Sequence, residues 1–281
     1  MGQDTKEIPR KKKEIKLARQ ENDVNNPILD KMMKDVDTSS VNPKLKEELI
    51  DLEKLFKQRQ GRLLSALRER YQYDTSVRHS QEFLLNHVNS KMSLVIMYAD
   101  LVGSTQMSMT LSLDKLVTII RAFSHEISSV VEIYRGHVLK YVGDAVIAFF
   151  GLGVNRYLTF DKAVSCAKWM IKVVKYGINP ILGRYGYPKL AVKIGMDVGE
   201  NVVVQYAYDK SSQIDLLGYT MNVSAKITSL TGANKISVGE KVFELLHPEV
   251  RADFRRLVPR KGEWRYINRD NGELYQVYTM K

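Results

Sequence analysis

The segment KYVGDAVIAFF, residues 140–150, places an aspartate in the middle of an apolar, strand-forming run. Gly143 and Asp144 are flanked by alternating β-branched and aromatic residues. This pattern predicts a tight turn between two strands, HVLKYV (137–142) and AVIAFF (145–150). Gly-Asp pairs are common in such turns, so Asp144 taken alone would be an ordinary turn acid. The rest of the chain gives this residue a second interpretation.

The elements around the hairpin alternate between strand and helix patterns. SLVIMYADL (93–101) predicts a buried strand, and two amphipathic helices are predicted over 113–134 and 160–182. Two further strands are predicted in LAVKIGMDVG (190–199) and NVVVQYA (201–207). The order strand, helix, two strands, helix, strand predicts an α+β fold of the ferredoxin-like type, an antiparallel or mixed sheet with helices on its outer face.

Composition indicates a soluble globular protein and excludes several other classes. The 281 residues are 44% apolar and 27% charged, and no apolar run is long enough to span a membrane. The start, MGQDTK, has no apolar signal core and departs from the myristoylation pattern. The single cysteine, Cys166, excludes an internal disulfide and a cysteine-rich zinc site, and it favours a cytoplasmic location. The net charge of +11 comes with no recognisable nucleic-acid module, so no nucleic-acid partner is expected.

The first third of the chain differs in composition from the rest. Residues 1–43 form a lysine-rich arm and a polar linker, and the arm could make weak contact with a membrane surface. Residues 44–90 are predicted to be helical, because leucines recur at spacings of three and four. This helix either dimerises as a short coiled coil or packs on its own domain, and both interpretations remain open. The catalytic domain is predicted over 91–281.

Two aspartates end neighbouring strands of the predicted sheet. Asp100 ends the first strand, Asp144 lies in the hairpin turn, and the first and third strands of a ferredoxin-like sheet lie side by side. Carboxylates on adjacent strands suit Mg²⁺ or Mn²⁺ together with substrate phosphates, and two such ions could activate an attacking oxygen and stabilise a leaving one. Gly103, Ser104 and Thr105 follow Asp100 and could bind phosphate through backbone amides. These residues predict a metal–triphosphate site.

Three blocks carry a resemblance to a known family: YADLVGST (98–105), KYVGDAVIAFFG (140–151) and IDLLGYTMNVSAK (214–226). In order and spacing they resemble the signature blocks of class III nucleotidyl cyclases, the adenylyl and guanylyl cyclases, over residues 91–281. The resemblance implies the class III cyclase fold. It also implies two Mg²⁺ or Mn²⁺ ions held by Asp100, Asp144 and the backbone carbonyl of Leu101, at two sites shared across a head-to-tail homodimer.

The resemblance also places a base-reading pair at Lys140 and Asp215. Adenine presents an acceptor at N1 and a donor at N6, and lysine donates while aspartate accepts. Guanine presents the opposite pattern, so the expected reaction is cyclisation of ATP to 3′,5′-cyclic AMP with release of pyrophosphate. Taken alone, Lys140 would be an outward-facing strand residue whose stem covers apolar surface.

Asn222 matches the asparagine that the family places beside the ribose in the transition state. Four residues later, where the family usually has arginine, this chain has Lys226. An i, i+4 pair shares one helix face, so the positive charge is kept while the planar guanidinium is lost. We therefore expect a slow but genuine cyclase. The family's further triphosphate-binding lysine has no secure match; the candidates are Lys261, Arg265 and Arg269.

Two alternatives remain open at this point. The chain could be a catalytically weak or silent cyclase-like module that binds nucleotide and signals through its N-terminal helix. It could also be a cyclase that uses GTP or a pyrimidine triphosphate. The sequence does not name the input signal: a separate partner, bicarbonate and the membrane surface are all compatible with it.

Overall fold

A computed structural model describes residues 76–152, 156–206, 213–268 and 271–281. The predicted arm and linker over 1–43 lie outside the described residues, as does most of the predicted helical segment over 44–90. Within the described residues, no helix is both long and apolar enough to cross a membrane.

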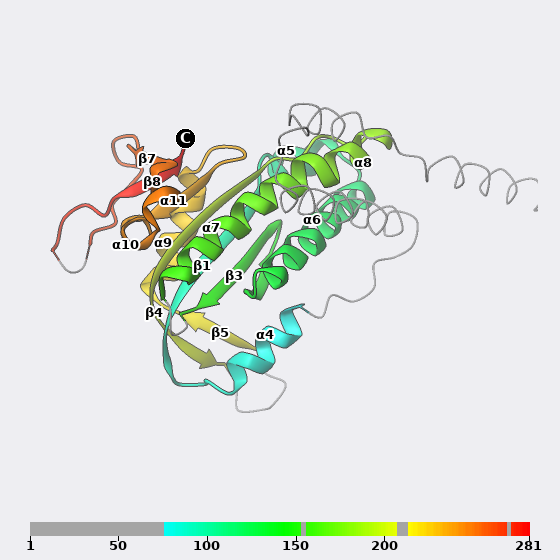
Figure 1. The fold of residues 1–281 in the computed structure, drawn as a ribbon. Helices are drawn as coiled ribbons and strands as arrows, with labels where there is room; N and C mark the ends of the chain where they lie inside the picture. Colours follow the sequence, from blue (N-terminus) through cyan, green and yellow to red (C-terminus); the bar gives the residue numbers. More distant parts are fainter. Residues whose placement is uncertain (1–75, 153–155, 207–212, 269–270) are drawn as a thin grey trace, which may run out of the picture. The chain divides into compact units, whose positions relative to one another are not determined.

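The centre of the fold is a sheet with the predicted ferredoxin-like order (Figure 1). Four antiparallel strands run side by side in the order β2-β3-β1-β4. Their bounds are β1 Lys91–Leu101, β2 His137–Val142, β3 Ala145–Gly151 and β4 Val192–Gln205. The sheet continues from β4 through a parallel pairing with β6, and then through β8 and β7, while β5 pairs with the far end of β4. These strands are β5 Ile214–Leu217, β6 Ile236–Gly239, β7 Phe254–Leu257 and β8 Val277–Met280.

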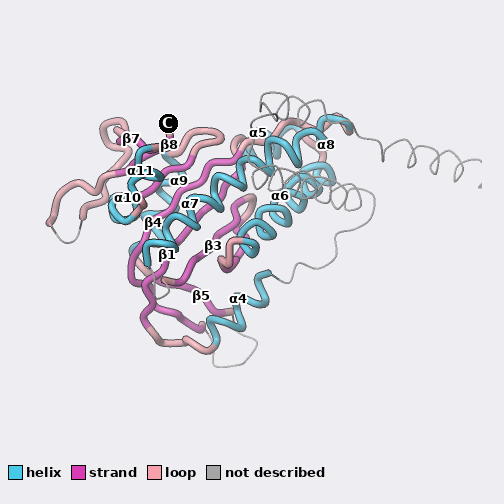
Figure 2. Tube along the Cα trace, in the orientation of Figure 1, coloured by secondary structure: helices cyan, strands magenta, loops and turns pink. Residues whose placement is uncertain are grey.

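Both long helices predicted from the sequence are confirmed (Figure 2). The first is α6, Leu113–Ile133. The second is α7, Arg156–Lys172, which continues through a π-helical segment, Val173–Ile178, into α8, Asn179–Arg184. The shorter helices are α4 Ser76–Leu85, α5 Ser104–Thr110, α9 Tyr219–Leu230, α10 Glu240–Leu245 and α11 Pro248–Ala252.

One predicted boundary was wrong. The two strands expected over 190–199 and 201–207 form the single strand β4, and Gly199 lies within it. This glycine is required by packing rather than by a turn: a Cβ atom there would lie 2.2 Å from the Thr220 Oγ1 atom of α9. Glycine therefore allows α9 to approach the sheet closely.

The sheet is covered on both faces. Leu94 and Ile96 of β1 point to the face that carries α4 and α9, where they join a buried apolar cluster. The alternate residues Val95, Met97 and Ala99 are buried on the opposite face, against α6 and α7. Full burial of side chains of this size contributes about 1.5–3 kcal/mol each, so the central strands form a firm support for residues at their ends.

Candidate active site

Asp100 and Asp144 meet at one end of the β1–β3 pair. The register places Asp100 opposite Ala145, the residue after Asp144, and Gly143 makes the turn possible with φ of 61°. Burial raises the pKa of Asp100, the neighbouring Lys193 lowers it, and the negative charge of Asp144 raises it. The register therefore places the two acids beside each other at one end of the sheet.

This acid pair fits a divalent cation. The Lys193 Nζ atom, on β4 opposite Asp100, lies 3.0 Å from Asp100 Oδ2 and supplies a positive charge to the pair. The Oδ2 atom of Asp144 is buried and has no hydrogen-bond partner among the described residues. Such an orphaned carboxylate oxygen is unfavourable unless a cation or donor satisfies it. Because no group of three or more His, Cys, Asp or Glu side chains in the described ranges could hold a metal, further donors would have to come from the backbone, water or substrate.

The predicted phosphate-binding residues lie directly after Asp100. Leu101 is the last residue of β1, and Gly103 has the left-handed φ of 77° before the first residue of α5. Ser104 and Thr105 form the first turn of that helix, and the Gly103 carbonyl accepts a hydrogen bond from Met107 N at 3.0 Å. Their contacts with a metal or a phosphate remain predictions.

Lys140 and Asp215 are brought together although they lie on different strands. Lys140 follows an irregularity in the β2–β3 register that re-aims the strand, and its Nζ atom donates a hydrogen bond to Asp215 Oδ2. Asp215, on β5, is buried, and its Oδ1 atom accepts a hydrogen bond from Leu216 N at 2.9 Å. Burial, together with the charge of Asp215, raises the pKa of Tyr98 to about 12. Lys140 is therefore paired rather than simply outward-facing.

Asn222 and Lys226 share one face of α9, as their spacing predicts. Asn222 is exposed and Lys226 is half-buried, whereas Val223 and Ile227 are buried in the core. Neither polar side chain forms a hydrogen bond or an ion pair with Asp100 or Asp144 within the described part of this chain. Of the candidate triphosphate-binding residues, Lys261 and Arg265 are exposed and Arg269 lies outside the described residues.

Sequence reasoning missed Lys193. Its contact with Asp100 depends on the register between β1 and β4, which pairs the two residues across neighbouring strands. The available signal was the pattern of the β4 strand, in which a lysine stands near the start of a mostly apolar run. That signal does not fix the register, so it does not identify the partner.

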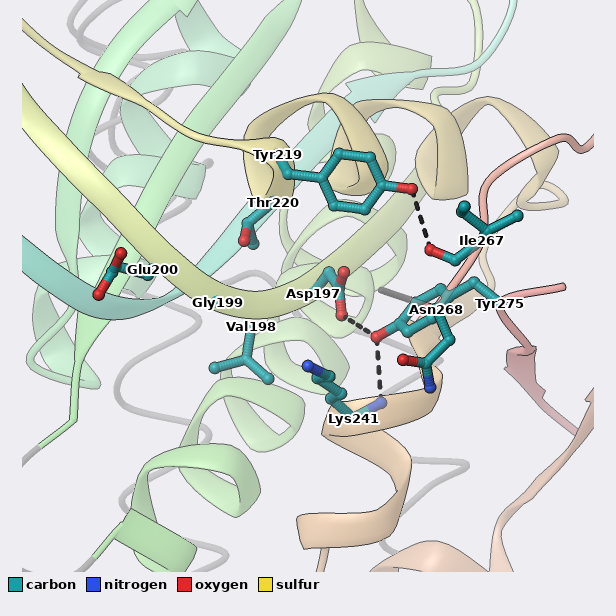
Figure 3. A pocket seen from close by; sticks show the side chains of 10 residues that line it. All are labelled: Asp197, Val198, Gly199, Glu200, Tyr219, Thr220, Lys241, Ile267, Asn268 and Tyr275. Carbon is teal, nitrogen blue, oxygen red and sulfur yellow. Dashed lines mark hydrogen bonds between the residues drawn. The ribbon is translucent and has the colours of Figure 1, made fainter. Parts of the chain in front are cut away.

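A separate pocket of about 240 Å³ contains none of the predicted site residues (Figure 3). It lies at the first turn of α9, where the Tyr219 hydroxyl donates to the Ile267 carbonyl at 3.2 Å. The Tyr275 hydroxyl donates to Asp197 Oδ1 at 2.8 Å and accepts from Lys241 N at 3.1 Å. Burial raises the pKa of Asp197 to about 7, and the Tyr275 hydrogen bond moderates this rise.

Comparison with known proteins identifies the family. The sequence family described as "Adenylate and Guanylate cyclase catalytic domain" matches residues 87–278. A cytidylate cyclase of Staphylococcus aureus is 26% identical over 204 residues, 69% of this chain and 44% of that protein. A uridylate cyclase of Burkholderia cepacia is 26% identical over 166 residues, 57% of this chain and 70% of that protein. The crystal structure of the adenylyl cyclase CyaB from P. aeruginosa has a TM-score of 0.56 at 21% identity, covering 68% of this chain and 95% of that one.

The chain therefore belongs to the adenylate and guanylate cyclase catalytic domain family, and its catalytic domain is that of a class III nucleotidyl cyclase. The resemblance seen in the sequence and the mixed α+β fold are both confirmed. Class III cyclases are metal-dependent and generally use Mg²⁺ or Mn²⁺. The relatives' names include cytidylate, uridylate and adenylyl cyclases, so family membership leaves the base open. The chain spans less than half the length of the first two matched relatives, 44% and 35%.

Proposed function

We propose that this chain catalyses the metal-dependent cyclisation of ATP to 3′,5′-cyclic AMP, with release of pyrophosphate. The observation that carries the proposal is the register of β1 and β3, which places Asp100 opposite the residue that follows Asp144, together with the buried Asp144 Oδ2 atom, which has no hydrogen-bond partner among the described residues. Family membership supports the reaction type.

Asp100, Asp144 and the Leu101 carbonyl would hold two Mg²⁺ or Mn²⁺ ions, which favour ionisation of the ribose 3′ hydroxyl and neutralise the triphosphate. The other roles belong to the chain itself. The amides after Gly103, with Ser104 and Thr105, would bind phosphate oxygens. Lys193 already lies beside Asp100, and its ammonium group can turn from the carboxylate to a phosphate when cations arrive.

The Lys140–Asp215 pair would read the base. The lysine donates to the adenine N1 atom, and the aspartate accepts from the N6 amino group. Guanine and uracil present the reverse arrangement of donor and acceptor. Each would leave a buried partner unpaired, which costs about 1–3 kcal/mol per group.

Cyclisation of CTP is the second candidate. Cytosine has an acceptor at N3 and a donor at N4, so it offers this pair the same pattern as adenine. The similarity to cytidylate cyclases of Staphylococcus aureus and Escherichia coli specifically favours this candidate. The Lys140–Asp215 pair therefore disfavours guanine and uracil, but it does not distinguish adenine from cytosine.

Asn222 and Lys226 would complete the site from a second copy of the chain. Asn222 would orient the ribose, and Lys226 would stabilise negative charge on the phosphoryl oxygens in the transition state. Their position on one accessible face of α9, without a bond to the acid pair of the same chain, supports a head-to-tail homodimer with two equivalent sites. Because lysine lacks the planar guanidinium, we infer slow turnover. A cytoplasmic location, in line with the single buried Cys166, is part of this proposal.

The test is to incubate the full chain with ATP, GTP, CTP or UTP and Mn²⁺, and to identify products by mass. A cyclic nucleotide from ATP supports the first proposal, and one from CTP alone supports the second. Saturable nucleotide binding without product would instead support a silent signalling module. Product from GTP or UTP in preference to both ATP and CTP would contradict the role given to Lys140 and Asp215.

A further inference from the structure

The helix that precedes the matched family domain contacts β5 directly. α4 ends at Leu85, before residue 87, where the family match begins. Gln81 of α4 forms two hydrogen bonds with the backbone of Ile214: its Nε2 donates to the carbonyl oxygen at 3.0 Å, and its Oε1 accepts from the N–H at 3.0 Å. The Gln81 amide therefore pairs with Ile214 as the backbone of a neighbouring strand would.

These bonds satisfy an edge of β5 that β4 does not cover. β5 is four residues long and pairs with β4 in the register Gln205↔Ile214 and Val204↔Asp215. The N–H and C=O groups of Ile214 point toward α4. The N–H of Leu216, the next residue but one, is bound by the Asp215 side chain. Gln81 thus binds the outward-facing backbone groups of Ile214, and the Asp215 carboxylate binds the next outward-facing N–H, that of Leu216.

α4 is itself fixed to the rest of the domain. Leu84 is fully buried in the apolar cluster with β1, β2 and β3. Phe83 stacks on His137 of β2, with ring centroids 4.6 Å apart. β2 carries Lys140 and β5 carries Asp215, so one helix contacts both strands of the pair.

We propose that Gln81 is a positioning residue for base recognition, because it holds the edge of β5 and thereby the Asp215 carboxylate beside Lys140. This inference rests on the proposed role of the Lys140–Asp215 pair. Leu84 of α4 shares an apolar cluster with Ile214 and Leu216 of β5, so packing also joins the two elements, but the Gln81 amide supplies the polar link to the β5 backbone. A displacement of α4 would therefore reach Asp215, and the base preference of the site depends on a helix outside the matched domain.

The test compares the wild-type chain with two variants, Gln81→Ala and Gln81→Met. Methionine keeps the length of the side chain but removes the amide, so Gln81→Met serves if Gln81→Ala does not fold. The matched control is Glu82→Gln, an exposed neighbour on the same helix. KM and kcat are measured for all four nucleoside triphosphates. We expect KM for the preferred nucleotide to rise about tenfold and its advantage over the others to shrink similarly, while kcat changes less than about twofold.

A second readout does not depend on turnover. Amide hydrogen exchange at Ile214 and Leu216 should become faster in Gln81→Met than in the wild type and in Glu82→Gln. If the wild type forms no product, the proposed function fails, yet the exchange rates still decide whether Gln81 holds β5. Unchanged exchange at both amides, or unchanged nucleotide discrimination in a folded and active Gln81→Met protein, would overturn the inference.

Discussion

The Lys140 ammonium group and the Asp215 carboxylate are joined by a hydrogen bond, although β2 pairs with β3 and β5 pairs with β4. Two strands that are not neighbours thus supply a donor and an acceptor at one point. The Leu216 N–H orients the carboxylate by binding its second oxygen. A donor beside an acceptor, both largely withdrawn from water, is suited to recognising one edge of a planar base.

Replacing the acceptor should relax the base preference. The side-chain amide in Asp215→Asn can donate as well as accept a hydrogen bond. It can therefore donate to the carbonyl oxygen of guanine or uracil, which the carboxylate cannot do. We expect the ratio of kcat/KM between the preferred and the disfavoured bases to fall about tenfold or more. Steady-state kinetics with the four triphosphates measure this ratio, and an unchanged ratio would argue against base contact by Asp215.

Restoring the guanidinium on α9 should raise turnover. Lys226→Arg can bind phosphoryl oxygens in a bidentate manner, whereas the lysine offers a single compact charge. We expect kcat to rise about tenfold, with KM changed much less, because the group acts chiefly in the transition state. Lys162→Arg, at an exposed position of α7, serves as the control. Equal or lower turnover in Lys226→Arg would show that lysine is not the weaker group here.

The core contribution of α4 is tested by two adjacent leucines. Leu84 is fully buried, whereas Leu85 is 44% exposed. Leu84→Ala should lower the free energy of unfolding by about 2–5 kcal/mol through lost burial and a residual cavity. Leu85→Ala should cost much less, and denaturant unfolding of the full chain measures both. Similar losses in the two variants would mean that α4 does not belong to this core.

Asp197 should make stability depend on pH. The folded protein keeps this proton until about pH 7, because burial raises the pKa of Asp197, whereas the unfolded chain releases it near the ordinary value of 3.8. Between these values the folded state binds one more proton, so this group lowers stability by up to about 1.4 kcal/mol per pH unit as pH rises, and not further above pH 7. In Asp197→Asn, urea unfolding between pH 5.5 and 8 should show a clearly flatter profile. Parallel profiles in the two proteins would refute this assignment.

Much of this architecture could be predicted because it depends on local patterns. The Gly143–Asp144 turn, the strand that carries Asp100 near its end and the shared helix face of Asn222 and Lys226 all follow from short-range periodicity and turn chemistry. The contacts of Lys193 and Gln81 could not be predicted in this way. The first depends on the register between β1 and β4, and the second on a side chain that substitutes for a strand. The predicted end of a strand at Gly199 was wrong for a related reason. A local sequence pattern does not reveal that this glycine packs against α9.

The most direct test of the shared cation position is Mn²⁺-dependent product formation by the wild type, Asp144→Asn and the exposed-acid control Asp114→Asn. The account predicts that Asp144→Asn remains folded, with an unchanged thermal midpoint or a higher one, because its buried oxygen has no partner to lose. Its cyclic nucleotide production should fall at least about a hundredfold. Asp114→Asn should retain wild-type production. Undiminished production by a folded Asp144→Asn protein would contradict the central claim.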